Sequence, residues 1–260
     1  MNVCNDYPMF AAIRRRLAAR KPFPGHWRKI LSDDVPFYHQ LSERNRVRLE
    51  EKLKIFALTK HFEGAGGMEV NERVEVVISA CAARLTLNLP DEHYSRLRAI
   101  IVYPGAYHHP GRDDIVLGEM SGRGTMVLSW QAVVHGLKNT EDGLNTAFHE
   151  FAHALDLEDG MFDGTPILES LCAYAPWVKI MTHYYDDLRD GRRRKRMLRR
   201  YGATNEAEFF AVATEAFFEK PRQLRKRKRD LYDLLSDYYN SDPAAELEAF
   251  IERDRDAKVS

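Results

Sequence analysis

The stretch HEFAHALD, at residues 149–156, contains an HExxH motif. On an α-helix, residues four positions apart lie one above the other on the same face. Two imidazoles at that spacing can bind one Zn²⁺, each at about 2.0–2.1 Å. Glu150 is rotated by roughly 100° from His149 around the helix axis, so its carboxylate can accept the proton of a metal-bound water. The stretch therefore predicts a zinc centre with His149 and His153 as ligands and Glu150 as the general base.

The residues around the motif favour a helix with one buried face. Apolar side chains recur there at helical spacing, at Leu144, Phe148, Phe151 and Leu155. Asp156 lies three residues after His153 on the face of the histidine pair, where its carboxylate can accept a hydrogen bond from a ligand imidazole or cap a neighbouring donor. Short motifs also occur by chance, and the alternative is a helix with two ordinary histidines.

A catalytic zinc site needs a third protein ligand. The metzincin extension of the motif would require a glycine at 156 and a histidine at 159, and the chain has aspartate at both positions. A carboxylate on a later helix is then expected, and the segment NEAEFFAVATEAFF at 205–218 offers Glu208 and Glu215 on one face. Buried carboxylates are costly unless they are paired or bind a metal. By this pattern either Glu could be the ligand, Glu208 could instead complete a capping box, and Glu215 could be a buried hydrogen-bonding partner.

Composition and periodicity predict one α+β domain. The 260 residues are 44% hydrophobic and 30% charged, which is enough apolar material for a core. The 39 basic residues balance the 39 acidic ones, which excludes a globally basic nucleic-acid binder. Residues 98–103 predict a strand, 115–117 and 125–130 predict a hairpin, and almost everything after residue 130 predicts helix. We expect a small sheet between two helical halves.

Prolines and basic residues are mixed in the first 36 residues, which we expect to form a loosely structured arm. One domain is expected at 37–260, with a helical half at 37–90 and a catalytic half at 91–260. The helices expected before the strands cover 9–20, 37–62 and 70–87.

The chain has no run of about 18 uncharged apolar residues, so no transmembrane helix is expected. Its first residues lack an apolar core long enough for a secretory signal. Cys4, Cys81 and Cys172 are too far apart for a CxxC clip and form no disulfide framework. These features predict a cytoplasmic protein.

Four motifs in this order resemble the Mlc titration factor A family of bacterial zinc peptidases: IVYP at 101–104, VLSW at 127–130, HEFAHALD at 149–156 and AEFFAVATEAFF at 207–218. The resemblance extends over about residues 90–235. HEFAHALD, followed downstream by a tyrosine and then EFF, also resembles the catalytic domain of anthrax lethal factor.

The resemblance implies a mainly helical, zincin-like (gluzincin) metallopeptidase domain with a small mixed β-sheet and one zinc ion per chain. It implies Glu208 as the third ligand, which leaves Glu215 and Asp156 as candidates for supporting hydrogen bonds. Tyr201, seven residues before Glu208, is implied as a donor to the transition-state oxyanion, although an aromatic residue there could equally serve packing. The strand at 125–130 is expected to have a free edge on which an extended peptide can pair, and a plain edge strand is the alternative.

Some members of the family have a further histidine just before the strand, described as an extra metal contact. Here the segment DDIVLGEMSGRG at 113–124 contains none, and His108 and His109 lie slightly earlier. We therefore do not assign that role to them, and the sequence does not decide whether either blocks the resting site.

Two basic runs lie on either side of the segment with Glu208. Residues 189–200 contain eight Lys or Arg and residues 220–229 contain seven. Such runs can bind an anionic partner, but a solvated loop and an exposed helix face are the favoured interpretation. No aromatic residues alternate with the first run, so direct nucleic-acid binding is not expected.

The sequence thus predicts a zinc-dependent peptidase acting on peptide substrates, with aminopeptidase activity as one form. The resemblance implies a partner, an Mlc-like transcriptional repressor of sugar uptake. The alternative is a regulatory binding protein that docks a repressor or nucleic acid on a zincin scaffold with vestigial catalysis. The intact set of site residues favours the peptidase: His149, Glu150, His153, Glu208 and Tyr201.

Overall fold

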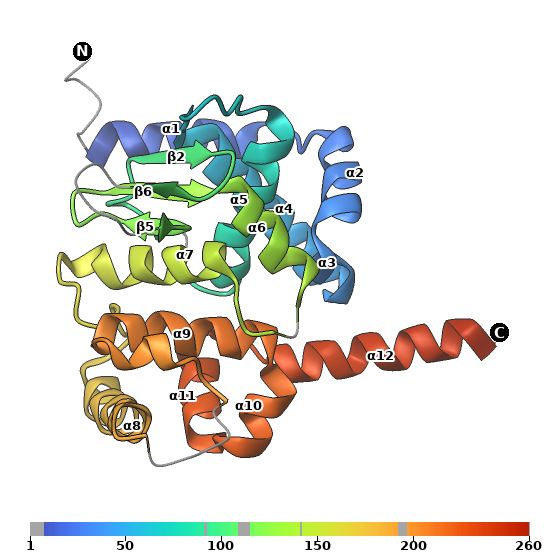
Figure 1. The fold of residues 1–260 in the computed structure, drawn as a ribbon. Coiled ribbons are helices and arrows are strands. Elements are labelled where there is room, and N and C mark those ends of the chain that lie inside the picture. Colours follow the sequence, from blue (N-terminus) through green and yellow to red (C-terminus); the bar gives the residue numbers. More distant parts are fainter. Residues whose placement is uncertain (1–7, 91–92, 109–114, 141, 192–196, 260) are drawn as a thin grey trace.

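The computed structural model describes residues 8–90, 93–108, 115–140, 142–191 and 197–259. It shows a mainly helical α+β protein with one small mixed sheet, as the sequence predicts. Figure 1 shows the sheet in the upper half of the molecule and a group of helices below it.

The helices of the N-terminal part pack beside the sheet and are α1 (Pro8–Arg20), α2 (Gly25–Asp34), α3 (Pro36–Gln40), α4 (Glu43–Thr59) and α5 (Glu72–Leu85). Trp27 and Leu31 of α2 are buried in the main hydrophobic core, so the expectation of a loosely structured segment is wrong for this helix. The division of the chain at residue 36 stays a prediction. The helix expected at 37–62 is instead two helices and a strand, because Ser42 caps a new helix by accepting a hydrogen bond from the Asn45 amide.

The main sheet has the order β1-β2-β6-β5 in the described part of the chain. Its strands are β1 (His61–Gly64), β2 (Ala99–Tyr103), β5 (Gly118–Met120) and β6 (Thr125–Ser129). β1, β2 and β6 are parallel, and β5 runs antiparallel to β6. β3 (Tyr107–His108) and β4 (Ile115–Val116) form a separate antiparallel pair.

Two expectations about strands need correction. The strand that forms the hairpin with β6 is β5, whereas most of the predicted strand at 115–117 belongs to β4 and pairs with β3. β6 lies between β2 and β5, so it has no free edge. The edge strand next to the helices is β5.

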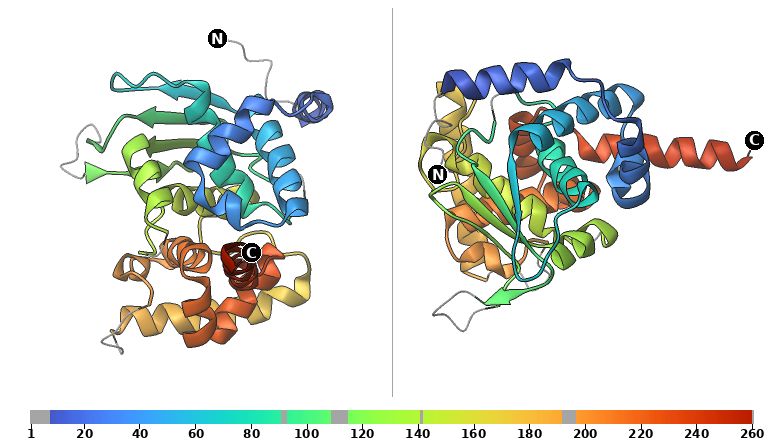
Figure 2. Two further views of the ribbon diagram at one scale, coloured as in Figure 1. Left: turned by 90° about the vertical axis from the view of Figure 1, so that its right-hand side faces the viewer. Right: turned by 90° about the horizontal axis from the view of Figure 1, so that it is seen from above.

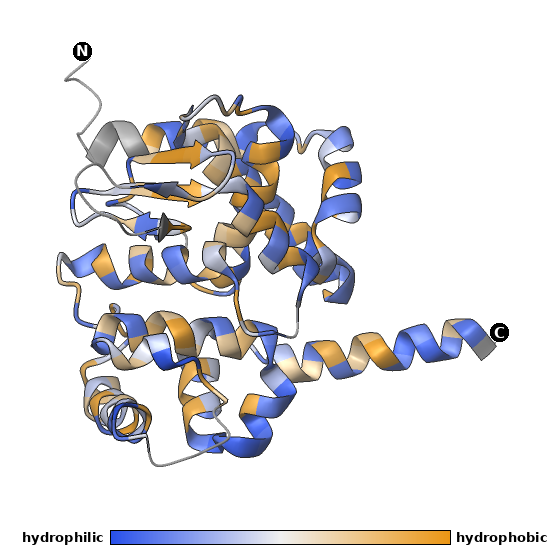
Figure 3. Cartoon of the chain, viewed as in Figure 1, coloured by the Kyte–Doolittle hydropathy of each residue, from blue (hydrophilic) through white to orange (hydrophobic). Residues whose placement is uncertain are grey.

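After β6 the described chain is helical, as expected. Its elements are α6 (Trp130–Lys138), α7 (Thr146–Asp156), the 3₁₀ turn η2 (Leu157–Asp159), α8 (Leu171–Arg189), the 3₁₀ turn η3 (Arg200–Ala203), α9 (Glu206–Glu219), α10 (Pro221–Arg227), α11 (Arg229–Tyr239) and α12 (Pro243–Val259). In Figure 1, α7 lies directly below the sheet and α9 lies below α7. α12 extends away from the body, and its exposed outer half is mostly hydrophilic in Figure 3. No helix in the described ranges is apolar over a length that would cross a bilayer.

α7 is buried along its whole length because it lies between the sheet and α9. A helix in such a place needs a well-formed end, since its first amides have no partner within the helix. Asn145 supplies this end by accepting a hydrogen bond from the Phe148 amide at 3.0 Å. Asn205 does the same for α9, at 2.9 Å from the Glu208 amide. The two caps fix the first residue of each helix, and so they fix which face of the helix each motif residue lies on.

Candidate metal centre

α7 and α9 bring His149, His153 and Glu208 together. The Nε2 atoms of the two histidines are 3.1 Å apart, and Glu208 Oε2 lies 2.9 Å from His149 Nε2 and 3.4 Å from His153 Nε2. These three residues could hold a metal ion, since one side-chain nitrogen or oxygen of each lies within 4.8 Å of the others. Both histidines are buried and Glu208 is partly exposed. The structure therefore joins two nitrogen donors and one carboxylate oxygen from two helices.

Glu215 lies on the other side of the His149 ring. Its Oε1 is 2.7 Å from His149 Nδ1, its Oε2 accepts a hydrogen bond from the Asn145 amide at 2.7 Å, and Arg199 donates to its Oε1. A carboxylate at Nδ1 favours a proton on that nitrogen, so Nε2 is the nitrogen through which His149 would bind a metal. The two glutamates that the helical pattern could not distinguish thus contact different nitrogens of one imidazole.

Glu150 is buried beside the edge strand. Its Oε2 has no hydrogen-bond partner among the described residues. Burial first, and nearby carboxylates after it, raise the pKa of Glu150 to about 8, against the lowering effect of His149. A Cβ atom at Gly118 of β5 would lie 2.7 Å from Glu150 Oε1, so only glycine leaves room for this carboxylate. Gly118 was not predicted as a site residue, because its approach to Glu150 depends on how the strand packs against α7 in the folded chain.

Tyr201 of η3 lies at the open side of the centre. Its hydroxyl donates to Glu208 Oε1 at 3.3 Å, and its ring centroid is 5.7 Å from that of His149. About half of the residue is exposed. Partial burial and the neighbouring Glu208 raise the pKa of Tyr201 to about 12, so the phenol keeps its proton at neutral pH. The tyrosine is therefore available as a hydrogen-bond donor next to the three converging atoms.

Asp156 is fully buried next to the centre. Its Oδ2 accepts a hydrogen bond from the Gly164 amide at 2.9 Å, and burial raises its pKa to about 6. Its Oδ1 and the Nδ1 of His153 have no partner in the described part of the chain. Of the two roles considered for this residue, the structure contains the cap on a neighbouring amide. Phe162 stacks on the His153 ring with centroids 5.0 Å apart, a contact that no sequence signal indicated.

The centre favours positive charge. Burial acts to lower the pKa of His149, but hydrogen bonds to Glu208 and Glu215 outweigh it and raise the pKa to about 10. Burial and the charge of His149 lower the pKa of His153. Burial opposes ionisation of Glu208, but its contacts with both histidines hold its pKa well below the usual range. The carboxylates around the two imidazoles thus stabilise a cation at this place.

Other histidines and the basic runs lie elsewhere. His108 is exposed on β3, His183 is exposed on α8, and His109 lies outside the described residues. Residues 192–196 of the first basic run also lie outside them. In the second run, Arg225 pairs with Glu248, and Arg229 pairs with Asp233 at 2.8 Å, so part of this charge is already compensated.

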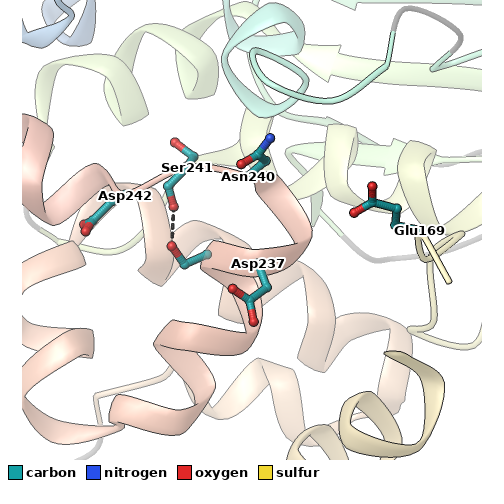
Figure 4. Close-up of a pocket in the computed structure, with 6 residues that line it drawn as sticks. Glu169, Asp237, Asn240, Ser241 and Asp242 are labelled. Carbon is teal, nitrogen blue, oxygen red and sulfur yellow. Dashed lines mark hydrogen bonds between the residues drawn. The ribbon is translucent and has the colours of Figure 1, made fainter. Parts of the chain in front are cut away.

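A separate pocket lies around the turn between α11 and α12 (Figure 4). Carboxylates, serines and an amide line it: Glu169, Ser236, Asp237, Asn240, Ser241 and Asp242. Ser236 Oγ donates to the Ser241 carbonyl at 2.5 Å, a contact within the turn itself. The pocket shares no residue with the centre between α7 and α9.

Comparisons with known proteins place the chain among metallopeptidases. The chain matches the family described as "Glucose-regulated metallo-peptidase M90" over residues 10–240. It is 37% identical to the Synechocystis protein slr2042 over 251 residues, which cover 91% of each chain. It is 27% identical to the Mlc titration factor A of Pectobacterium atrosepticum over 242 residues, or 86% of this chain and 89% of the relative. The Yersinia pestis protein of that name is 26% identical over 238 residues. With two histidines of α7 and a carboxylate of α9 converging, and with the family match spanning most of its length, the chain belongs to the glucose-regulated metallo-peptidase M90 family.

Proposed function

We propose that this chain is a zinc-dependent peptidase with a zincin-like fold and a gluzincin-type centre. The observation that carries the proposal is the convergence of His149 Nε2, His153 Nε2 and Glu208 Oε2 within 4.8 Å of one another. Catalytic zinc is typically bound by three nitrogen or oxygen donors, with a fourth position kept for water or substrate. We assign these three residues as the ligands.

The donor set itself fits Zn²⁺. Two imidazole nitrogens that face each other at 3.1 Å, with a carboxylate oxygen beside them, are satisfied by one cation placed among them. Glu215 at the far nitrogen of His149 fits the carboxylate–histidine arrangement that orients metal ligands. Nitrogen and oxygen donors without thiolates suit zinc.

In the proposed reaction a water molecule attacks the scissile carbonyl of a peptide. When bound, Zn²⁺ would supply Lewis acidity, polarising that carbonyl and lowering the pKa of the attacking water. With the positive charge of the metal beside it, the Glu150 carboxyl group would be ionised, and it would take the water's proton and return it to the leaving amine. The Tyr201 phenol donates a hydrogen bond to the carbonyl oxygen as that oxygen gains negative charge.

We assign β5 as the strand that aligns the substrate. Within the described residues β5 pairs with β6 on one side alone, and Gly118 of β5 touches Glu150. An extended peptide that adds to this edge would pass close to the general base. We therefore propose that β5 pairs with the substrate, in place of the strand at 125–130 that we expected to do so.

The finer proposal is aminopeptidase activity. It is tested with a peptide series in which each member is offered with a free and with an acetylated N-terminus. An aminopeptidase cleaves the first residue from the free forms and leaves the acetylated forms intact. Internal cleavage of both forms would show an endopeptidase instead. We propose the cytoplasm as the compartment, since the cysteines form no disulfide framework.

The names of several relatives support a proposed partner. Proteins called Mlc titration factor A cover 85–86% of this chain at 26–27% identity. We propose that the chain binds an Mlc-like transcriptional repressor. Purified repressor and this protein should co-elute in size-exclusion chromatography, and separate elution at micromolar concentration would contradict the proposal. A zinc-free preparation in the same experiment shows whether docking needs the metal.

The first prediction is one Zn²⁺ per chain. Elemental analysis of the purified protein should find it, a chelator should remove it together with peptidase activity, and added zinc should restore both. Affinity should fall on acidification, because a protonated imidazole cannot bind the metal and zinc binding therefore releases protons. Protein that binds no zinc at neutral pH after reconstitution would contradict the proposed function.

The second prediction concerns Tyr201→Phe. The phenol contacts Glu208 and lies beside His149, so we expect a loss of transition-state stabilisation with zinc content and KM nearly unchanged. Such a donor contributes about 10²–10³-fold to kcat in a dry site, and the half-exposed position of Tyr201 favours the lower end.

The measurement for Tyr201→Phe is steady-state kinetics with zinc assayed in the same preparation. Tyr103→Phe, which removes a phenol from β2, is the control and should behave as the parent protein. An unchanged kcat in Tyr201→Phe would show that this tyrosine serves packing and that another group donates to the oxyanion.

A further inference from the structure

Arg199 is the residue just before η3 and touches both sides of the candidate centre. Its guanidinium donates to Oε1 of Glu215, which is fully buried. The guanidinium carbon also lies 5.9 Å from the ring centroid of Tyr201, within the range of a cation–π contact. The Arg199 side chain itself is 31% exposed. One cation thus links a carboxylate on α9 with the tyrosine on η3.

These contacts belong to a closed chain of interactions around the centre. Glu215 Oε1, which receives Arg199, also lies 2.7 Å from His149 Nδ1. On the other side of that ring, His149 Nε2 is 2.9 Å from Glu208, and Glu208 accepts the Tyr201 hydroxyl at 3.3 Å. A displacement of Arg199 would therefore disturb Tyr201 directly, and it would disturb His149 indirectly, through Glu215.

The backbone around Arg199 is anchored, which lets the side chain act as a support. Leu198 is buried, and a Cβ atom at Gly202 would lie 3.1 Å from Val212 Cβ and 3.4 Å from Phe209 Cα. η3 therefore rests directly on α9. The guanidinium donates to Glu215 through Nη2, and its Nε is buried without a hydrogen-bond partner among the described residues. A fully buried carboxylate also needs a charge partner to offset its desolvation.

We propose that Arg199 is a positioning residue of the metal centre that orients His149 through Glu215 and Tyr201 through its ring. The proposal rests on the zinc-peptidase function proposed above. It gives Arg199 a role of its own within the basic run at 189–200, because its guanidinium is paired with the fully buried Glu215.

The test compares Arg199→Gln, Arg199→Lys and the control Arg200→Gln, which removes the same charge from the exposed neighbouring residue. Zinc affinity is measured by competition with a chromophoric chelator, and ligand geometry by the visible spectrum of the Co²⁺-substituted protein. Thermal unfolding of each zinc-free variant identifies those that fail to fold. kcat and KM are measured on the zinc-loaded forms with one peptide.

We expect Arg199→Gln to weaken zinc binding about 10–100-fold, the usual cost of losing a partner that supports a ligand. Its Co²⁺ spectrum should change, and its kcat should fall with little change in KM. Arg199→Lys should recover part of the affinity, since it keeps a cation near Glu215 and loses the planar group that lies over the Tyr201 ring. Combining Arg199→Gln with Tyr201→Phe should cost less in kcat than the product of the single losses, because part of the loss in Arg199→Gln comes from misplacing the phenol that Tyr201→Phe already removes.

Zinc affinity, Co²⁺ spectrum and kcat equal to those of the parent would overturn the role of Arg199. The same holds if Arg199→Gln only lowers the unfolding temperature while its folded form binds zinc as the parent does. Equal losses in Arg200→Gln would also overturn it, because the effect would then follow charge alone. A parent protein without zinc affinity would instead refute the proposed function, and the role of Arg199 with it.

Discussion

Glu150→Gln is expected to keep the zinc content of the protein and to lower kcat on the order of 10²–10⁴-fold, the usual contribution of a general base. The substitution preserves the size of the side chain and removes its ability to take a proton. Glu150 lies beside Gly118 in a buried position, and its Oε2 has no hydrogen-bond partner among the described residues. The amide is therefore tolerated by the fold, and the loss appears in turnover.

The measurement for Glu150→Gln is single-turnover cleavage of a chromogenic peptide, with zinc determined in the same sample. Glu169→Gln on the exposed surface is the matched control and should retain parental activity and zinc. Peptidase activity equal to that of the parent in Glu150→Gln would show that another group accepts the proton. Loss of zinc in this variant would show that the substitution disturbs the centre itself.

Glu208→Ala is expected to remove zinc from the protein at concentrations where the parent is fully loaded. It deletes one of the three converging donor atoms, and two imidazoles alone make an incomplete site. Glu215→Gln should weaken zinc binding by about 10–100-fold, because Glu215 supports His149 at Nδ1 and does not face the other donors. The difference between the two variants decides which glutamate is the ligand.

Isothermal titration of zinc into each metal-free variant measures this difference. Glu206→Ala removes an exposed carboxylate from the first turn of the same helix and should bind zinc as the parent does. If Glu215→Gln lost zinc completely and Glu208→Ala kept it, the two assignments would have to be exchanged. Circular dichroism of each metal-free variant shows whether the helices are intact.

The local elements of the catalytic part could be predicted because their signals lie within a few residues. The apolar stripe around the HExxH motif predicted α7, and the apolar run at 98–103 predicted β2. The loosely structured arm was wrong where α2 buries Trp27 and Leu31. That burial depends on helices farther along the chain, so it could not be predicted from the composition of the segment itself.

The arrangement of the strands could not be predicted in the same way. The sequence indicated a hairpin, but the first of its strands begins at Gly118, and β2 covers the outer side of β6. Which strand becomes the edge depends on hydrogen bonds between segments far apart in the chain. The expectation of a free edge at 125–130 failed for this reason, although the strand itself is present.

The sequence by itself determined that His149 and His153 share one helix face, because four residues make about one turn of any α-helix. It also determined the family, through motifs that occur in a fixed order. Only the tertiary structure decided that Glu208 faces both histidines, that Glu215 contacts the far nitrogen of His149, and that Arg199 donates to Glu215. Glu208 and Glu215 lie along the same helix face and are equivalent in the pattern. They become different when α9 packs against α7, because the imidazole of His149 presents a different nitrogen to each.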